Sequence, residues 1–419
     1  MARGPWRRIG WRNLGRNRRR SIIAASMLAV GYFSVVVMWG WAEGLVAEMI
    51  GNGTEILTGQ LQVHASEYSP DKSVYETIGG TAGIDVTAVV QDVAADPAID
   101  AAAPRVYGGG LVSSGSATSA AVFLGIDPDL EPRVSRLMAA LERGRTPQPG
   151  ANEVLIGTEM ARTLRVEPGD EVVVVAPAID GSMGNDLFVV AGVFSSGMAD
   201  LDRTFALFPI DALQWLMALP PNRVHEIAAR VVDPWQAPVA AERVGVLLDA
   251  QGLDVAAESW TTLRPEMVEY ARLTQSFQWI LLAIVFGMAI FGVANTMLLA
   301  TFERRNEFAV LLALGTKPSG IVRSVFFEAL GLGTIGLAVG AVMTLPILVW
   351  WHNAPPDMSW LFGGFTMQGA LIRPVLRVEY SWAMAIYAAV ALFATVALAS
   401  VYPAFRAARI PPADTMAGR

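Results

Sequence analysis

The sequence predicts a membrane α-helical protein with four transmembrane helices and a large α+β extracytoplasmic domain inserted between helices 1 and 2. Three observations predict this class. An uncharged apolar run from Ile22 to Trp41 lies near the N-terminus, a stretch of mixed composition follows it, and three more apolar runs occupy the last third. A helix needs about 20 predominantly apolar residues to cross a bilayer core, and each run meets that length.

The apolar runs set the expected boundaries of the chain's segments. Tryptophans near the ends of the runs, such as Trp41, Trp279 and Trp350, fit the aromatic belts found at membrane surfaces. We expect transmembrane helices at 21–42, 277–302, 321–351 and 382–402, a cytoplasmic coupling helix at 303–320, an extracytoplasmic loop at 352–381 and a cytoplasmic tail at 403–419.

The distribution of charge predicts the orientation. Residues 1–20 contain eight arginines and no acidic residue, and Arg406 and Arg409 follow the last apolar run. Positively charged flanking segments stay in the cytoplasm, so we expect both termini there, an N-in/C-in topology. The insert at 43–276 has 32 acidic and 14 basic residues, which fits an extracytoplasmic domain and gives no reason to expect nucleic-acid binding.

Residues 1–20 form the predicted cytoplasmic amphipathic basic segment. Trp6, Ile9 and Asn13 would share one face of a helix that has arginines around the remainder. Such a helix lies on the membrane surface, whereas a basic cluster that only fixes topology is the alternative interpretation; the two are compatible.

The insert shows strand and helix patterns in two α+β pieces with a joint near 147–150, where the sequence is Pro-Gln-Pro-Gly. Alternating and apolar stretches predict strands, and periodic stretches predict helices. The expected strands are 60–65, 120–125, 153–156, 171–176, 187–194, 223–232 and 253–258, and the expected helices are 86–94, 158–164, 209–217 and 235–251.

The segment after the second apolar run combines charge with an apolar stretch that ends at Gly315, a typical helix stop. A solvated loop needs no such run of apolar residues, so the segment predicts a helix that docks on a partner. The candidate coupling residues are Glu303, Arg304, Arg305, Glu307, Leu311, Leu314 and Gly315.

No catalytic site is predicted. The sequence contains no cysteine and no Gly-Lys pair of the kind that binds nucleotide phosphates in a P-loop. The three histidines, His64, His225 and His352, lack the spacing of metal ligands. We therefore expect a non-enzymatic chain without a metal or cofactor of its own.

Several motifs together resemble the FtsX/MacB/LolC-LolE superfamily of ABC transporter permeases over nearly the whole chain. They include ERRNE at 303–307 leading to LALG at 312–315, FEA at 327–329 and YPAFRAAR at 402–409. Within the insert, GIDP at 125–128, GDEV at 169–172 and VAGVFSSG at 190–197 are most similar to the LolC/LolE lipoprotein-release branch.

The resemblance implies the transmembrane subunit of an inner-membrane transporter that extracts lipoproteins or lipids from the outer leaflet. It implies a dimer of cytoplasmic ABC ATPases that binds ATP and magnesium, a second permease copy or paralogue, and a periplasmic carrier or adaptor protein. The alternatives within the superfamily are a MacB-like mechanotransmission permease for efflux and an FtsX-like regulator of an extracytoplasmic enzyme.

The resemblance also suggests where cargo would bind. Its acyl chains would enter a cavity between the first and second transmembrane helices, although a lipid-facing or packing role is the alternative for each candidate. The candidates are Val37, Met38, Trp41, Phe277, Ile280, Leu281 and Ile284.

Two features complete the sequence picture. Glu328 is an acidic residue inside the third apolar run, where either a functional role or a structural ion pair is expected.

The family's carrier-binding hook would lie at 177–186, where this chain has a shortened segment. The aromatic-rich loop at 352–381 suggests a structured cap.

Overall fold

The computed structural model describes residues 18–68, 73–79, 84–358, 365–367, 370–372, 375–411 and 415. The predicted surface helix around Trp6, Ile9 and Asn13 lies outside the described residues, as do Trp360 and Phe362 of the predicted cap. The chain divides into two compact units, one built around the long apolar helices and the other comprising residues 48–269 together with 364–373.

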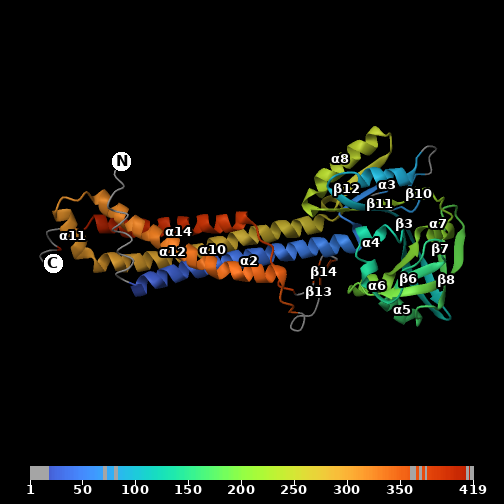
Figure 1. The fold of residues 1–419 in the computed structure, drawn as a ribbon, viewed down its shortest axis with the longest axis horizontal. Helices are drawn as coiled ribbons and strands as arrows, with labels where there is room; N and C mark the ends of the chain where they lie inside the picture. The colour runs from blue at the N-terminus through green and yellow to red at the C-terminus, as the bar shows by residue number, and fades with distance from the viewer. Residues whose placement is uncertain are drawn as a thin grey trace. The chain divides into compact units, whose positions relative to one another are not determined.

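Four described helices are long and apolar enough to cross a membrane (Figure 1), and they run side by side. They are α2 (Arg18–Gly53), α10 (Pro265–Glu303), α12 (Pro318–Asn353) and α14 (Trp382–Ala408). At 1.5 Å per residue, α2 and α10 are each more than about 50 Å long, well beyond the roughly 30 Å of a bilayer core. The limits of the membrane spans within these helices stay a prediction.

Small residues set the packing between α2 and α12. A Cβ atom at Gly336 would lie 2.7 Å from the Cβ of Leu28, and one at Gly340 would lie 3.0 Å from the carbonyl oxygen of Ala29. Within a membrane, helices associate through close packing at small residues because lipid is as apolar as the helices themselves. The G-x-x-x-G pair therefore serves an intramolecular contact.

A second pair of glycines on α2 accommodates the chain before α14. The backbone N–H of Glu379 donates to the carbonyl oxygen of Gly40 at 3.0 Å, and Val378 is fully buried. A Cβ atom at Gly44 would lie 2.1 Å from the carbonyl oxygen of Arg377. This segment therefore passes directly across α2, and only glycine leaves room for it.

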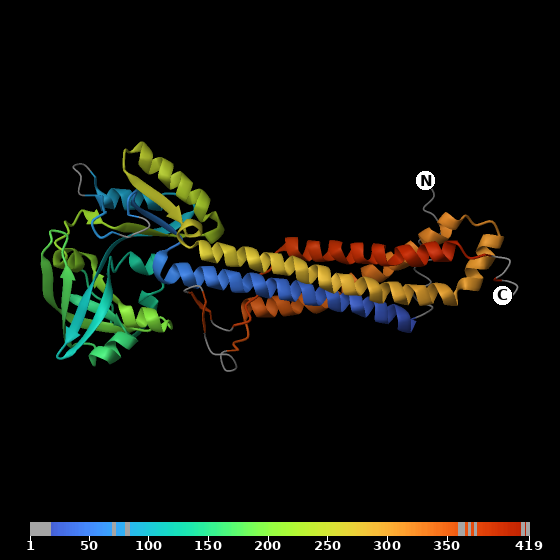
Figure 2. The same cartoon turned by 180° about the vertical axis from the view of Figure 1, so that it is seen from behind.

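The second unit is an α+β domain (Figure 2). Its strands are β1 (Leu61–Ala65), β2 (Ile78–Gly79), β3 (Ile99–Ser114), β4 (Ala117–Ile126), β5 (Leu141–Gly144), β6 (Glu153–Gly157), β7 (Glu171–Pro177), β8 (Met183–Phe194), β9 (Phe205–Pro209), β10 (Arg223–Val224), β11 (Glu226–Val231) and β12 (Val255–Ser259). Two further strands, β13 (Phe365–Met367) and β14 (Ala370–Ile372), pair with each other.

The domain's helices are short apart from one. They are α3 (Val86–Ala94), α4 (Glu131–Val134), α5 (Thr158–Leu164), α6 (Ala199–Thr204), α7 (Ile210–Leu216), α8 (Ala237–Ala250) and α9 (Trp260–Leu263). A π-helical turn η1 (Thr54–Thr58) and two 3₁₀ turns, η2 (Met138–Ala140) and η3 (Pro234–Gln236), complete the elements. All the helices and strands that the sequence predicts in this region are present, with limits shifted by a few residues; the expected strand 223–232 divides into β10 and β11.

Ten strands form one sheet in the order β12-β1-β11-β3-β4-β9-β6-β8-β5, and β7 pairs with both β3 and β8. Part of this sheet therefore closes on itself. The closed part is formed by the pairings β3–β4, β4–β9, β9–β6, β6–β8, β8–β7 and β7–β3. In this part of the domain, the fully buried ring of Phe208 contacts the fully buried rings of Phe123 and Phe188.

The predicted joint at 147–150 lies between β5 and β6. Strands from both sides of it pair, since β4 runs parallel to β9 and β3 is antiparallel to β7. This joint consequently does not divide the sheet in two. Strand β3 belongs to both the closed part and the open part formed with β11, β1 and β12, on which α3 and α8 pack.

Replacement of Gly336 by leucine should weaken the packing of α12 on α2. Overpacking of a close contact costs about 1–3 kcal/mol, so the melting temperature of the detergent-solubilised chain, measured by scanning fluorimetry, should fall. Gly287→Leu is the matched control because no neighbouring atom would contact its Cβ within 4 Å. Equal melting temperatures for the two variants would contradict the assigned contact.

Candidate functional site

The turn that joins α10 to α12 forms the first candidate site. Arg304 lies between α10 and the helix α11 (Arg305–Ala313), and Gly315 follows that helix with a φ of +86°. The N–H groups of Gly315 and Thr316 donate to the carbonyl oxygens of Leu312 and Leu311, both at 3.0 Å. These paired bonds are a Schellman motif, so the predicted helix stop at Gly315 is confirmed.

Arg304 holds this turn together. Its Nη1 donates to Glu328 Oε2 at 2.9 Å and its Nε donates to Glu307 Oε2 at 3.0 Å, while its guanidinium lies 5.0 Å from the ring centre of Phe308. The side chains of Arg304 and Glu328 are only 10% and 16% exposed. The acidic residue inside the third apolar helix therefore has an ion-pair partner on the preceding turn.

Glu303, the last residue of α10, pairs with Arg20 in the first turn of α2, where Nη1 donates to Oε2 at 2.8 Å. The pair is bidentate and its carboxylate is about half exposed. Exposed ion pairs contribute little to stability because water and salt screen them, so this pair mainly specifies which helix ends meet. The sequence analysis overlooked Arg20 because eight arginines precede α2 or start it.

The remaining predicted coupling residues divide by exposure. Leu314 is 78% exposed and Leu311 is 36% exposed, and Arg305 and Glu307 are also exposed. Phe308 and Ala309 are instead buried in the core of the helix bundle. Part of the apolar run in α11 therefore packs within the chain, and the rest faces outward.

The predicted cavity residues also divide. Phe277, Ile280 and Ile284 are more than half exposed on α10, and Met38 on α2 is 40% exposed. Trp41 and Leu281 are half-buried, whereas Val37 is buried within the helix bundle. The structure thus leaves an exposed apolar face on α10 and assigns Val37 to internal packing.

An aromatic cluster joins three helices near that face. The ring centres of Trp39 and Trp279 lie 5.1 Å apart, and Tyr387 of α14 lies 5.5 Å from Trp279. Gln278 is 4% exposed, and neither of its side-chain polar atoms has a partner among the residues that the structure describes. The sequence indicated Trp279 only as a tryptophan near the end of an apolar run, because its contacts with Trp39 and Tyr387 form only in the folded helix bundle. Gln278, a polar residue inside the second apolar run, is a signal that could have been recognised.

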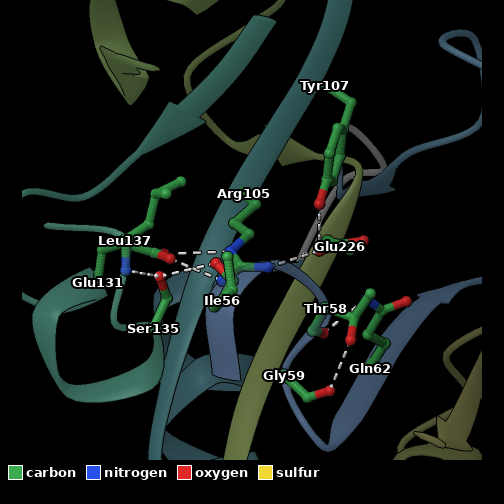
Figure 3. A network of polar contacts seen from close by, with 10 residues as sticks. All are labelled: Ile56, Thr58, Gly59, Gln62, Arg105, Tyr107, Glu131, Ser135, Leu137 and Glu226. Atoms are coloured by element: carbon green, nitrogen blue, oxygen red, sulfur yellow. Dashed lines mark hydrogen bonds and ion pairs between the residues drawn. The ribbon is translucent and has the colours of Figure 1, made fainter. Parts of the chain in front are cut away.

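A buried ion cluster forms the second candidate site, inside the extracytoplasmic domain (Figure 3). Arg105 of β3 donates from Nε and Nη2 to the two oxygens of Glu131 at 3.1 and 2.6 Å. Its Nη1 donates to Glu226 Oε1 at 3.3 Å, and the hydroxyl of Tyr107 donates to the same oxygen at 2.9 Å. None of the three charged side chains is more than 1% exposed.

The cluster keeps its donors protonated. Burial, the largest single cause, would lower the pKa of Arg105, but the combined effects of Glu131, Tyr107 and Glu226 outweigh burial and the pKa is raised. Burial, followed by the charge of Glu226, raises the pKa of Tyr107 far above its usual value. Since removal of one partner from a buried ion pair leaves an uncompensated charge, this cluster constrains the geometry of β3, β11 and α4 strongly.

Hydrogen bonds connect the end of α2 to the same region. The N–H of Arg136 donates to the carbonyl oxygen of Glu55 at 2.8 Å, and Ser135 Oγ donates to the carbonyl oxygen of Ile56 at 3.3 Å. Both donors follow α4, the helix that carries Glu131. The chain that leaves α2 is thereby bound to the helix that holds the ion cluster.

His225 lies beside the cluster in a fixed neutral form. Its Nδ1 accepts from the backbone N–H of Tyr107 at 3.0 Å, and its Nε2 donates to the carbonyl oxygen of Val74 at 2.9 Å. Because Nδ1 accepts a hydrogen bond it carries no proton, so the two bonds together require the neutral ring with its proton on Nε2. Burial lowers the pKa of His225, and the charge of Arg223 acts in the same direction.

The hairpin at the predicted hook is short and packed against the domain. The turn between β7 and β8 closes with the N–H of Ala178 bonded to the carbonyl oxygen of Ser182 at 2.9 Å. The N–H of Ile179 donates to the carbonyl oxygen of Met217 just after α7, and a Cβ atom at Gly184 would lie 1.9 Å from the carbonyl oxygen of Leu216. This hairpin is therefore bound along its tip to α7 and does not form a free hook.

The features together define a multi-pass membrane permease with an extracytoplasmic core domain. Residues 21–246 match the MacB-like periplasmic core domain family, and residues 279–412 match the FtsX-like permease C-terminal family. The chain belongs to the FtsX/MacB superfamily of ABC transporter permeases, in its LolC/LolE branch.

Two curated relatives and one solved structure illustrate the similarity. The chain is 25% identical over 332 residues to the lipoprotein-releasing system transmembrane protein LolC of Xylella fastidiosa strain Temecula1, covering 77% of this chain and 78% of LolC. It is 23% identical over 331 residues to LolE of Haemophilus influenzae, with the same coverage of 77% and 78%. The periplasmic region of MacB from Actinobacillus actinomycetemcomitans is 16% identical, with a TM-score of 0.38, over 53% of this chain and 97% of that one.

Arg304→Met should destabilise the turn after α10 because Glu328 then loses its ion-pair partner in a largely apolar setting. We expect a loss of up to about 3 kcal/mol in unfolding free energy, visible as a lower melting temperature. The double variant Arg304→Met/Glu328→Leu removes both charges and should recover most of the loss. If the double variant is as unstable as the single one, the ion pair is not the cause.

The neutral state of His225 predicts a pH dependence of domain stability. The pKa of His225 is lower in the folded state than in the unfolded state, where it is about 6.5. The free energy of unfolding should therefore have its full value above about pH 6.5 and decrease as the pH falls below that value, by at most about 1.4 kcal/mol per pH unit. Hydrogen exchange of β3 and β11 in the intact chain between pH 5 and 8 measures this effect. His225→Gln retains a donor and an acceptor without titrating and should flatten the profile; an unchanged profile would contradict the assignment.

Proposed function

We propose that this chain is the transmembrane permease subunit of an ATP-driven ABC complex in the inner membrane. The complex extracts lipoproteins or lipids from the outer leaflet. One observation carries the proposal: the similarity to LolC and LolE, named as lipoprotein-releasing proteins, extends over about three quarters of each chain. The 332 aligned residues are more than the α+β domain contains, so the match also includes part of the apolar helices.

The proposed topology places both termini in the cytoplasm and the α+β domain outside. The basic residues before α2 and at the end of α14 support this orientation, as does the acidic composition of residues 43–276. In this topology α11 lies on the cytoplasmic side, between the second and third transmembrane helices.

A dimer of separate ATPase subunits would bind α11 and supply ATP and magnesium. The exposed Leu311 and Leu314, with 46%-exposed Val310, provide an apolar surface for this contact. Arg304 ties α11 to α12 through Glu328, so a force on α11 would reach the third transmembrane helix directly. A flexible loop at this place would absorb the motion instead.

Two unbroken helices would carry the motion onward. Both α2 and α10 contribute residues to each of the two compact units without an interruption in the helix. At the end of α2, the bonds to the segment after α4 lead to the Arg105 cluster in the sheet. The proposed work of the chain is mechanical, and ATP hydrolysis belongs to its partner.

Cargo acyl chains would occupy a cavity formed with a second permease copy or paralogue. The exposed face of Phe277, Ile280 and Ile284 on α10, with Met38 on α2, is the surface available for them. Val37 is removed from this set because its own helix bundle buries it. The bulky aromatic cluster of Trp39, Trp279 and Tyr387 fixes the helices behind the face.

One observation favours MacB-like mechanotransmission as a second candidate. Carrier recruitment through a hook needs a protruding hairpin, but the tip of β7–β8 is bound to the end of α7. If a carrier is used, it must bind another surface of the domain. An efflux assembly would need an adaptor protein in place of a carrier.

Purification of the complex from native membranes with its ATPase, followed by mass spectrometry, tests the function. We expect a triacylated lipoprotein or a defined lipid to remain bound. Ile280→Trp should reduce the bound cargo several-fold by filling the proposed surface, whereas Val390→Trp, at a similarly exposed position on α14, should not. A complex without bound lipoprotein that instead retains an adaptor would exclude extraction and support mechanotransmission.

A further inference from the structure

A cavity of about 450 Å³ opens where the end of α10 meets the end of α14, away from the candidate cargo face. This volume is within the range of sites that bind small molecules or headgroups. Its lining combines three arginines with three aromatic rings: Arg305, Arg406, Arg409, Phe302, Tyr402 and Phe405. None of the described residues around it is acidic.

One arginine is held in place and two are available. The guanidinium of Arg406 lies 4.9 Å from the ring centre of Phe302, and its Nη1 donates to the hydroxyl of Tyr402 at 2.9 Å. Arg305 and Arg409 are exposed and form no side-chain ion pair with any residue in the described ranges. Three positive charges around one cavity without a counter-charge favour an anionic ligand.

The depth of the cavity matches the headgroup region of a bilayer. Helix α14 begins at Trp382, and its 27 residues extend over about 40 Å, so its last two turns pass beyond a hydrocarbon core of roughly 30 Å. The arginines at 406 and 409 lie in or just after those turns, and Phe302 lies one residue before the end of α10.

Apolar surface continues from the cavity toward the membrane centre. On α14, Leu398 and Val401 precede Phe405 at helical spacing, and all three are about half exposed or more. On α10, Leu299 and Phe302 are likewise about half exposed and one turn apart. A soluble anion would need only the arginines, whereas a lipid would use these apolar faces for its acyl chains.

We propose that this cavity is a binding site for the phosphate headgroup of an anionic phospholipid, whose acyl chains lie along the exposed faces of α10 and α14. Basic pockets between transmembrane helices bind such headgroups in general. Arg406 would donate from its fixed position, and Arg305 and Arg409 would close around the phosphate. The bound lipid would join α10, α11 and α14, because Arg305 is the first residue of α11. This inference does not depend on the cargo.

Native mass spectrometry of the delipidated full chain in a neutral detergent tests the site. The probes are palmitoyl-oleoyl phosphatidylglycerol, phosphatidylcholine with the same acyl chains, and inorganic phosphate. We expect one phosphatidylglycerol molecule to bind the chain more tightly than phosphatidylcholine does. Arg406→Gln and Arg409→Gln should each weaken the affinity for phosphatidylglycerol about fivefold. Arg323→Gln is the control, since it removes an exposed arginine of α12 that does not line the cavity.

Four outcomes would overturn the proposal. Equal affinity for the two lipids would show that the site binds only acyl chains, through its apolar surface. An equal loss of phosphatidylglycerol affinity in Arg323→Gln would show a general effect of charge. Displacement of the lipid by inorganic phosphate would identify a site for a soluble anion. In the complex with the ATPase, loss of the lipid together with a cross-link from position 409 to an acidic ATPase segment would identify a protein-docking surface. Unchanged melting temperatures would verify that the single variants fold.

Discussion

The bilayer's lack of hydrogen-bonding partners is the constraint on which the rest of this structure depends. A segment that crosses the hydrocarbon core must satisfy its own backbone groups, and an α-helix does so within one segment. The chain meets this requirement with four long helices, and it confines their interruptions to places outside the apolar runs, such as the turn at Arg304. Helix packing then cannot rely on the hydrophobic effect, which explains why Gly336 and Gly340 lie at the close contact of α12 with α2.

Because of the same constraint, the ion pairs between the long helices lie near the helix ends. Arg304 and Glu328 form a pair near one end of the helix bundle, and Arg20 and Glu303 form a second pair close by in sequence. A charged side chain inside lipid is costly unless it is paired or reaches the interface. Each pair therefore specifies which helix ends meet, and the apolar helices between them need no polar contacts for this purpose.

The sequence predicted the features that depend on local chemistry. Helix α3 and helix α5 have the predicted limits, and α11 stops before Gly315, as predicted. Strand β3 was missed because its Ala- and Gly-rich sequence has few of the β-branched residues that signal a strand. The closure of the sheet by the pairing of β3 with β7 could not be predicted either, because these strands are far apart in the chain.

Candidate residues show the same division. The docking role of α11 stays a prediction, and the burial of Phe308 could not be foreseen, because an apolar helix face looks alike whether it contacts its own chain or a partner. Val37 was assigned to a cargo cavity for the same reason. The ion cluster at Arg105 was missed because its three charges lie on β3, β11 and α4, and only the folded sheet brings them together.

The Arg105 cluster bears on how the extracytoplasmic domain can respond to motion. The domain contains no cysteine, so no disulfide fixes its parts. An apolar core tolerates small displacements, whereas a buried ion pair loses its compensation when its atoms separate, and the cost is then several kcal/mol. Since the segment after α4 bonds to Glu55 and Ile56 of η1, the turn that directly follows α2, displacement of η1 relative to β3 and β11 would strain the Arg105–Glu131 contact. The sheet and η1 should therefore move together.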